Sequence, residues 1–147
     1  MEKKIKEEKI AVKPSINPKD YFTGVGRRKQ AVARVWLKLG KGEILVNEKP
    51  LKQYFAYLSD NKILEEPLRV VNRIGQISGS VKVTGGGIKS QADAVVHGIS
   101  RALVNLDETL RSPLAKRSLL TRDSRVKERR KYGFAGKARK QKQSPKR

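Results

Sequence analysis

Apolar and polar positions alternate most clearly between residues 31 and 39, as expected for a half-buried β-strand. Residues 21–26 and 76–84 also have β character, the latter through alternating apolar positions. Gly40-Lys41-Gly42 indicates a turn, and residues 43–47 are expected to pair back on residues 31–39 as a hairpin strand. In the strand at 31–39, one face carries Ala31, Ala33, Val35, Leu37 and Leu39, and the other carries Val32, Arg34, Trp36 and Lys38.

A different period, with apolar residues three and four apart, predicts helices in the rest of the chain. Leu51, Tyr54, Phe55 and Leu58 have this spacing, and Pro50 suits the first helical position. Residues 59–75 have no clear period, and we expect one or two short helical turns around residue 64 and residues 68–71.

The strongest helical pattern follows Gly85-Gly86-Gly87. Ser90 and Asp93 resemble a capping box, so the helix is expected to begin at Ser90. A shorter helix is expected over residues 108–119, where Pro113 either kinks the helix or starts it anew. The apolar stripe of the long helix is Ala92, Val95, Val96, Ile99, Ala102, Leu103 and Leu106, with Asp93, His97, Ser100 and Arg101 on the opposite side.

The order β-β-β-α-β-α-α predicts an α+β two-layer sandwich with helices on one face of a sheet. Residues 1–20 mix Lys and Glu around two prolines, and we expect a flexible, disordered N-terminal arm. Residues 21–120 are expected to form the globular domain, and residues 121–147 an extended basic tail.

Composition excludes several classes of site. The 147 residues include no cysteine and one histidine, so disulfides, thiolate zinc sites, a cysteine nucleophile and histidine-based metal sites are excluded. No apolar run approaches the ~20 residues of a membrane span. The carboxylates are scattered without a pair. We therefore expect no enzyme activity, no cofactor, no metal and no membrane partner.

Charge points to a polyanion as the partner. The net charge is +21, and residues 111–147 carry fifteen Lys and Arg against two acids, a net charge of +13. Gly133 and Gly136 interrupt this basic segment, which has too few apolar residues to form a core of its own. A solvated basic face is the alternative, but the composition favours an arm that wraps a nucleic acid.

Two glycine-containing segments are candidate phosphate contacts. Arg27, Arg28 and Lys29 follow Gly24-Val25-Gly26 at an expected strand turn, where three cations would reach an RNA backbone; the alternative is an exposed turn with incidental charge. Gly85, Gly86 and Gly87 precede a helix and could present backbone N–H groups to a phosphate; the alternative is a tight turn. Neither segment matches a dinucleotide or P-loop motif.

Three aromatic or titratable side chains have an open interpretation. Trp36 and Tyr54 could stack on bases, but their spacing fits packing equally well. His97 lies off the apolar stripe and is interpreted as a satisfied surface histidine. Two functions from other classes are alternatives to structural RNA binding: a phosphate-handling enzyme, which would need a Ser-containing phosphate loop and a base, and a free RNA chaperone or ribonuclease cofactor.

Several motifs occur in a fixed order: Thr23 to Lys29 (TGVGRRK), Val83 to Gly87 (VTGGG), His97-Gly98-Ile99, Thr121-Arg122-Asp123, Glu128 to Gly133 (ERRKYG) and the final Lys146-Arg147. With these motifs, the chain from residue 21 to 147 resembles the small-subunit ribosomal protein S-nine family in its bacterial form. The resemblance implies a ribosomal-protein-S-five second-domain-like fold with a left-handed βαβ crossover.

The resemblance also implies partners. The domain would pack on small-subunit ribosomal RNA in the head, beside neighbouring small-subunit head proteins. We expect cytoplasmic ribosomes, with organellar ribosomes as the less favoured alternative. The tail would run through RNA to the peptidyl site, where Lys146 and Arg147 would contact the P-site tRNA anticodon loop. Ser144-Pro145 replaces the family's usual aromatic-Ser pair before these residues. The residues expected to bind ribosomal RNA are Arg27, Arg28, Lys29, Gly85, Gly86, Gly87, Arg122, Arg125, Arg129, Arg130, Lys131, Lys137, Arg139 and Lys140.

Overall fold

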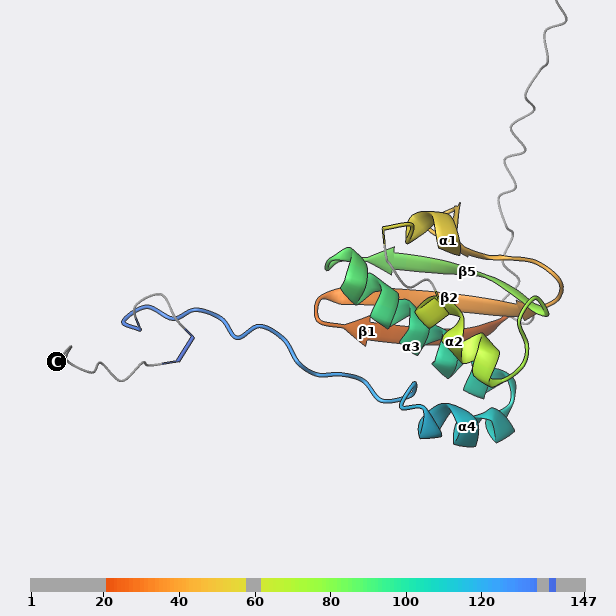
Figure 1. The fold of residues 1–147 in the computed structure, drawn as a ribbon. Helices are drawn as coiled ribbons and strands as arrows, with labels where there is room; N and C mark the ends of the chain where they lie inside the picture. The colour runs from red at the N-terminus through yellow and green to blue at the C-terminus, as the bar shows by residue number, and fades with distance from the viewer. Residues whose placement is uncertain (1–20, 58–61, 135–137, 140–147) are drawn as a thin grey trace, which may run out of the picture.

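The protein forms one mixed five-stranded sheet with its helices on one face, followed by an extended segment (Figure 1). This computed structural model describes residues 21–57, 62–134 and 138–139. The expected N-terminal arm at residues 1–20 therefore lies outside the described residues. The elements are β1 (Phe22–Arg28), β2 (Ala31–Leu39), β3 (Ile44–Val46), β4 (Lys49–Pro50), α1 (Leu51–Tyr54), α2 (Lys62–Val70), β5 (Ile77–Thr84), α3 (Ile88–Leu106), the short 3₁₀ helix η2 (Glu108–Leu110) and α4 (Arg111–Lys116).

The strand order is β1-β2-β5-β3-β4, so β2 and β5 lie inside the sheet. The predicted inward residues of β2 are buried from Ala31 through Leu37, whereas Leu39 is 51% exposed near the end of the strand. The α+β two-layer architecture is confirmed, because the helices cover the face to which these residues point (Figure 1).

The predicted hairpin between residues 31–39 and 43–47 is wrong. β2 pairs with β1 through the turn at Lys29-Gln30, and β3 pairs in parallel with β5, with Ile44 opposite Gly79. An alternating pattern determines which face of a strand is buried but not which strand lies beside it. β5 is long enough to pair with most of β2, whereas β3 has three residues and pairs in parallel after a crossover through α1 and α2.

The two helices of this crossover differ from the prediction. α1 ends at Tyr54, and Pro50 is its N-cap residue rather than its first helical residue. The segment expected to contain short turns forms a single helix, α2, which includes Pro67. Phe55, which follows α1, is fully buried and packs edge-on against Tyr54.

The long helix α3 is confirmed, but its capping box is not. Gly87 is the N-cap residue, and Ser90 lies inside the helix, nearly buried and without a capping hydrogen bond. The sequence pattern predicts Ser100 on the polar side of the helix, yet Ser100 is fully buried and its hydroxyl donates to the Val96 carbonyl at 2.8 Å. α3 packs against both the sheet and α2, which explains why more of its circumference is buried.

The last predicted helix is split in two. The 3₁₀ turn η2 comes first, and α4 begins at Arg111, which places Pro113 in the first turn of α4. A proline is tolerated there because the N–H groups of a first turn have no intrahelical partner. Of the two alternatives for Pro113, the structure selects a helix that starts anew.

The glycines of β1 allow α3 to approach the sheet closely. A Cβ atom at Gly26 would overlap the Ala94 carbonyl oxygen and lie 2.5 Å from the Gly98 nitrogen. A Cβ at Gly24 would lie 2.6 Å from the nitrogen of Ala102. The Gly-Val-Gly segment thus has a structural reason: it permits contact between the backbones of a strand and a helix.

Candidate nucleic-acid interface

Two turns lie side by side at one end of the sheet. The first is the β1–β2 turn at Lys29-Gln30, and the second is Gly85-Gly86-Gly87, between β5 and α3. A Cβ at Gly85 would lie 2.6 Å from the Gln30 carbonyl oxygen, so the two backbones are almost in contact. Gly85 and Gly86 have φ angles of +73° and +66°, which non-glycine residues rarely adopt. These glycines are therefore required by the turn itself, whatever it binds.

The three cations of the β1–β2 turn have different surroundings. Arg27 and Lys29 are exposed to solvent. The Arg28 side chain is only 13% exposed, and its guanidinium lies 2.9 Å from the carboxylate of Asp123 and 3.6 Å from that of Asp93. Arg28 also donates a hydrogen bond to the backbone carbonyl of Arg125 at 2.7 Å. The turn is thus connected to the start of the tail and to α3.

Asp123 organises the first residues of the tail. Its carboxylate accepts a hydrogen bond from the backbone N–H of Arg125 at 2.9 Å and contacts the Arg125 guanidinium at 2.6 Å. These Arg125 hydrogen bonds, with a further contribution from Arg28, hold the pKa of Asp123 well below its ordinary value. The carboxylate therefore remains ionised at neutral pH.

Residues just before the tail are attached to the domain. Leu119 and Leu120 pack against the core, and the Leu120 carbonyl lies 3.3 Å from Nε2 of His97. A carbonyl oxygen can only accept, so Nε2 carries the proton in this contact. The other ring nitrogen, Nδ1, is buried without a hydrogen-bond partner. The interpretation of His97 as a satisfied surface histidine is therefore wrong.

The environment of His97 opposes its protonation. Burial lowers the pKa of its imidazole below the ordinary value of 6.5, and the nearby charges of Arg101 and Arg122 lower it further, against the effect of the Leu120 hydrogen bond. The sequence could not show this, because residues 119 and 120 approach α3 only in the folded chain.

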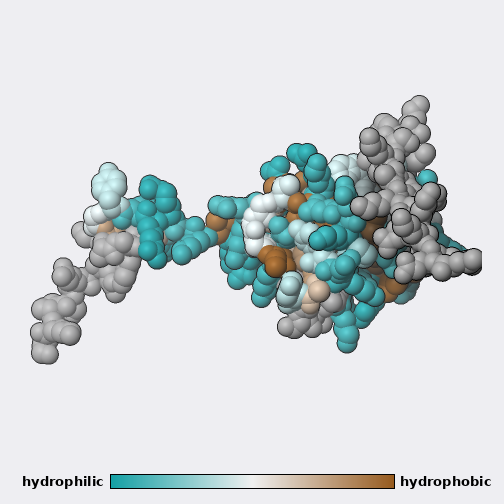
Figure 2. Space-filling view, turned by 90° about the horizontal axis from the view of Figure 1, so that it is seen from above, coloured by the Kyte–Doolittle hydropathy of each residue, from teal (hydrophilic) through white to brown (hydrophobic). Residues whose placement is uncertain are grey.

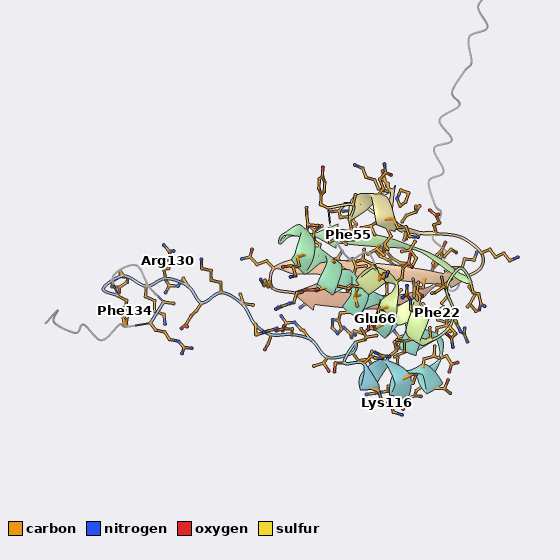
Figure 3. All side chains as sticks on the ribbon, in the orientation of Figure 1. Phe22, Phe55, Glu66, Lys116, Arg130 and Phe134 are labelled. Atoms are coloured by element: carbon orange, nitrogen blue, oxygen red, sulfur yellow. The ribbon has the colours of Figure 1, made fainter. Side chains whose placement is uncertain are left out.

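Beyond Asp123, the tail is extended and basic. Residues 122–131 form neither helix nor strand and lead away from the domain (Figure 1). Figure 2 shows that most of the coloured surface of this segment is hydrophilic. Arg130, labelled in Figure 3, projects from the tail at a distance from the domain. The exposed cations of the described tail that the sequence assigned to RNA are Arg122, Arg125, Arg129, Arg130, Lys131 and Arg139.

The second acid of the tail is paired within the tail. Glu128 lies 3.0 Å from Arg139 and 3.5 Å from Lys131, and the Arg139 hydrogen bond contributes most to lowering its pKa. The predicted contacts Lys137, Lys140, Lys146 and Arg147 lie outside the described residues. The two turns and the root of the tail are thus adjacent, whereas Arg129 to Lys131 extend away from them.

Sequence reasoning missed the role of Asp123. One signal was available: an acid in a segment expected to bind a polyanion needs a cationic partner of its own.

The structure shows different surroundings for the two aromatic residues that could stack on bases. The Tyr54 hydroxyl donates to Gln91 at 3.1 Å, which favours a packing role, whereas Trp36 is half-buried on the opposite face of the sheet.

Other classes of site find no support among the described residues. No group of three His, Cys, Asp or Glu side chains that could hold a metal ion occurs in the described ranges. Within the same ranges, no helix has the length and apolarity to cross a bilayer.

Comparison with protein families gives one match that covers most of the chain. A family model described as "Ribosomal protein S9/S16" matches residues 26–147. The match begins within β1 and includes both turns, α3 and the whole basic tail.

Proposed function

Since the chain belongs to the ribosomal protein S9/S16 family, it is a structural protein of the small ribosomal subunit, and we propose how it binds RNA there. The end of the domain that carries the two turns contacts phosphates of small-subunit ribosomal RNA in the head, and the tail continues along the RNA. The observation that carries this proposal is the exposed basic tail, which leaves the domain beside the turns of Lys29 and Gly85-Gly86-Gly87 (Figure 1).

In this proposal the tail contributes most of the affinity for RNA, and the folded domain contributes specificity by matching the shape of the RNA. Each Lys or Arg that neutralises a phosphate releases condensed counterions, so binding is strong and sensitive to salt. An extended basic segment reads little sequence, and specificity for folded RNA comes from shape. The exposed Arg27 and Lys29, the glycine turn and the tail cations, with Lys137 and Lys140, provide the contacts to ribosomal RNA.

A pair of tail residues tests the RNA contact. Replacing Arg129 and Arg130 by Gln should weaken binding to a small-subunit ribosomal RNA transcript and reduce the slope of log K against log salt by about two. Replacing Lys116 and Arg117, in and just after α4, by Gln removes the same charge and serves as the control. Equal effects of the two double variants would show that only net charge matters, and would contradict a specific role for the tail.

The finer assignment concerns tRNA. We place Lys146 and Arg147 against the anticodon loop of P-site tRNA on cytoplasmic ribosomes, and we assign the domain to the ribosomal-protein-S-five second-domain-like fold. Lys146 and Arg147 lie outside the described residues. Their assignment is therefore supported by the family and by the direction in which the described tail leaves the domain. A photoreactive residue at position 146 of assembled subunits should crosslink to the anticodon loop; crosslinks to ribosomal RNA alone would overturn this assignment.

Sedimentation separates the ribosomal function from a free RNA chaperone. The protein should co-sediment with small subunits at physiological salt, and neighbouring head proteins should crosslink to it. A protein that binds RNA but does not remain with the subunit would contradict the ribosomal proposal for this chain.

A further inference from the structure

The sheet has a second face that no described helix covers. Gly24 and Gly26 point to α3, so the residues between and beside them in β1 point to the opposite side. Strand register extends this face across β2 and β5, where Arg34 lies between Val25 and Lys82. We call this surface the open face; its residues are Thr23, Val25, Arg27, Val32, Arg34, Trp36, Lys38, Ser78, Ser80, Lys82 and Thr84.

On β1, β2 and β5, every charged residue of the open face is cationic, and Leu45 of β3, which is 41% exposed, adjoins them opposite Ser80. Arg27, Arg34, Lys38 and Lys82 are all exposed, and none pairs with a carboxylate among the described residues. Arg34 and Lys82 are direct cross-strand partners. Like charges in this position destabilise a sheet, so the pair has no explanation in the folding of the isolated domain. It would be stabilised by an anion that lies across β2 and β5.

An aromatic ring lies beside these cations. Trp36 occupies the middle of the open face, between Thr23 on β1 and Ser80 on β5, and its side chain is half-buried. Its neighbours across the strands are small and polar, so they cover only part of the indole. A flat ring within a basic, polar surface is the arrangement on which nucleobases stack.

We propose that the open face is a second RNA-binding surface, on which phosphates contact Arg34 and Lys82 while a base or ribose packs on Trp36. The proposal rests on the RNA-binding function above and adds a surface separate from the tail. An RNA partner is favoured over a protein because every charged group that β1, β2 and β5 contribute to this face is cationic. Arg27 also joins the open face to the Lys29 turn, so one RNA segment can pass from one to the other.

Trp36 provides the direct measurement, because it is the only tryptophan in the sequence. Titrating the full chain with a small-subunit ribosomal RNA transcript should quench its fluorescence and protect it from acrylamide. RNA binding measured by mobility shift, with no change in Trp36 emission or accessibility, would overturn the open-face proposal while leaving the proposed function intact. Absence of any RNA binding would instead overturn the proposed function.

Matched charge variants test the two cations. Arg34→Gln with Lys82→Gln should weaken binding about tenfold and reduce the salt slope by about two. Lys62→Gln with Lys116→Gln removes two exposed charges from the helical layer and should have a smaller effect. If both double variants lose the same affinity and slope, the open face is not a specific site.

A tail variant separates the two surfaces. Arg129→Gln with Arg130→Gln should lower affinity yet keep full Trp36 quenching at saturation, whereas Arg34→Gln with Lys82→Gln should reduce the quenching itself. The thermal melting curve of each variant confirms folding. Quenching of Trp36 by neighbouring head proteins, and not by RNA, would show a protein partner and overturn the proposal.

Discussion

The guanidinium of Arg28 lies 2.9 Å from the carboxylate of Asp123 and so joins the end of β1 to the root of the basic tail. The same arginine donates to the Arg125 carbonyl at 2.7 Å, and thus holds both a side chain and the backbone of the tail. Register places Arg28 opposite Ala31, on the helical side of the sheet. The negative charge of Asp123 would repel a polyanion, but it attracts the guanidinium of Arg28.

Asp123→Asn should release the root of the tail. The Arg125 amide donates to Asp123 in the wild-type protein, and the NMR order parameters of residues 122–125 should fall below about 0.6 in the variant. RNA affinity should fall as well, because a mobile tail must be ordered on binding. Net charge alone predicts the opposite change, an increase in RNA affinity, because the variant has one acid fewer.

Glu128→Gln is the control for this change. It also removes an acid from the tail, but Glu128 pairs with Arg139 and Lys131 rather than with the domain. Residues 122–125 should stay ordered in this variant. Unchanged order parameters in Asp123→Asn would show that the ion pair does not fix the tail.

His97 should make stability depend on pH below neutrality. Burial lowers the pKa of His97 from 6.5, so the unfolded chain binds more protons than the folded one in the window just below that value. The stabilising contribution is complete above pH 6.5 and is lost as the pH falls through the folded-state pKa. Urea midpoints at about pH 7.5 and 5.5 measure the difference.

His97→Gln keeps a donor for the Leu120 carbonyl and does not titrate. Because His97 is the only histidine, this variant should lose most of the pH dependence between these two conditions. A wild-type slope that persists in the variant would assign the effect to another group.

Gly26→Ala should destabilise the domain by about 3 kcal/mol, since its Cβ would overlap the backbone of α3 at Ala94. Gly87→Ala is the matched control, because a Cβ at Gly87 meets nothing within 4 Å. The control should change the free energy of unfolding by less than about 1 kcal/mol. Equal losses in chemical denaturation would contradict the close approach of β1 and α3.

Asn47 extends the pairing of β5 beyond the end of β3. Its side-chain amide accepts from the Val83 N–H and donates to the Val83 carbonyl, both at 3.0 Å. Its backbone φ is +47°, a conformation that favours Asn and Gly. Asn47→Gly, which keeps this conformation, should lose about 1–2 kcal/mol from the hydrogen bonds, and Asn47→Ala about 1 kcal/mol more. Equal stabilities of the two variants would exclude the backbone contribution.

Much of the secondary structure followed from local pattern. The strands at residues 31–39 and 76–84 and the long helix were predicted because burial on one side imposes a period of two or of 3.6 residues. Partners across space were not predictable in this way. Residues 43–47 have the alternation of a strand, but only the folded chain shows that β5 lies between them and β2.

The sequence by itself determined that this protein is a small α+β domain with a basic, extended tail, and its ordered motifs indicated the ribosomal family. These properties depend on composition and on the spacing of neighbouring residues, which local physics controls. The tertiary structure decided the strand order, the helix start at Gly87 and the ion pair that joins Arg28 to Asp123. Arg28 and Asp123 are 95 positions apart in the sequence, and only packing of the whole domain brings their charges into contact.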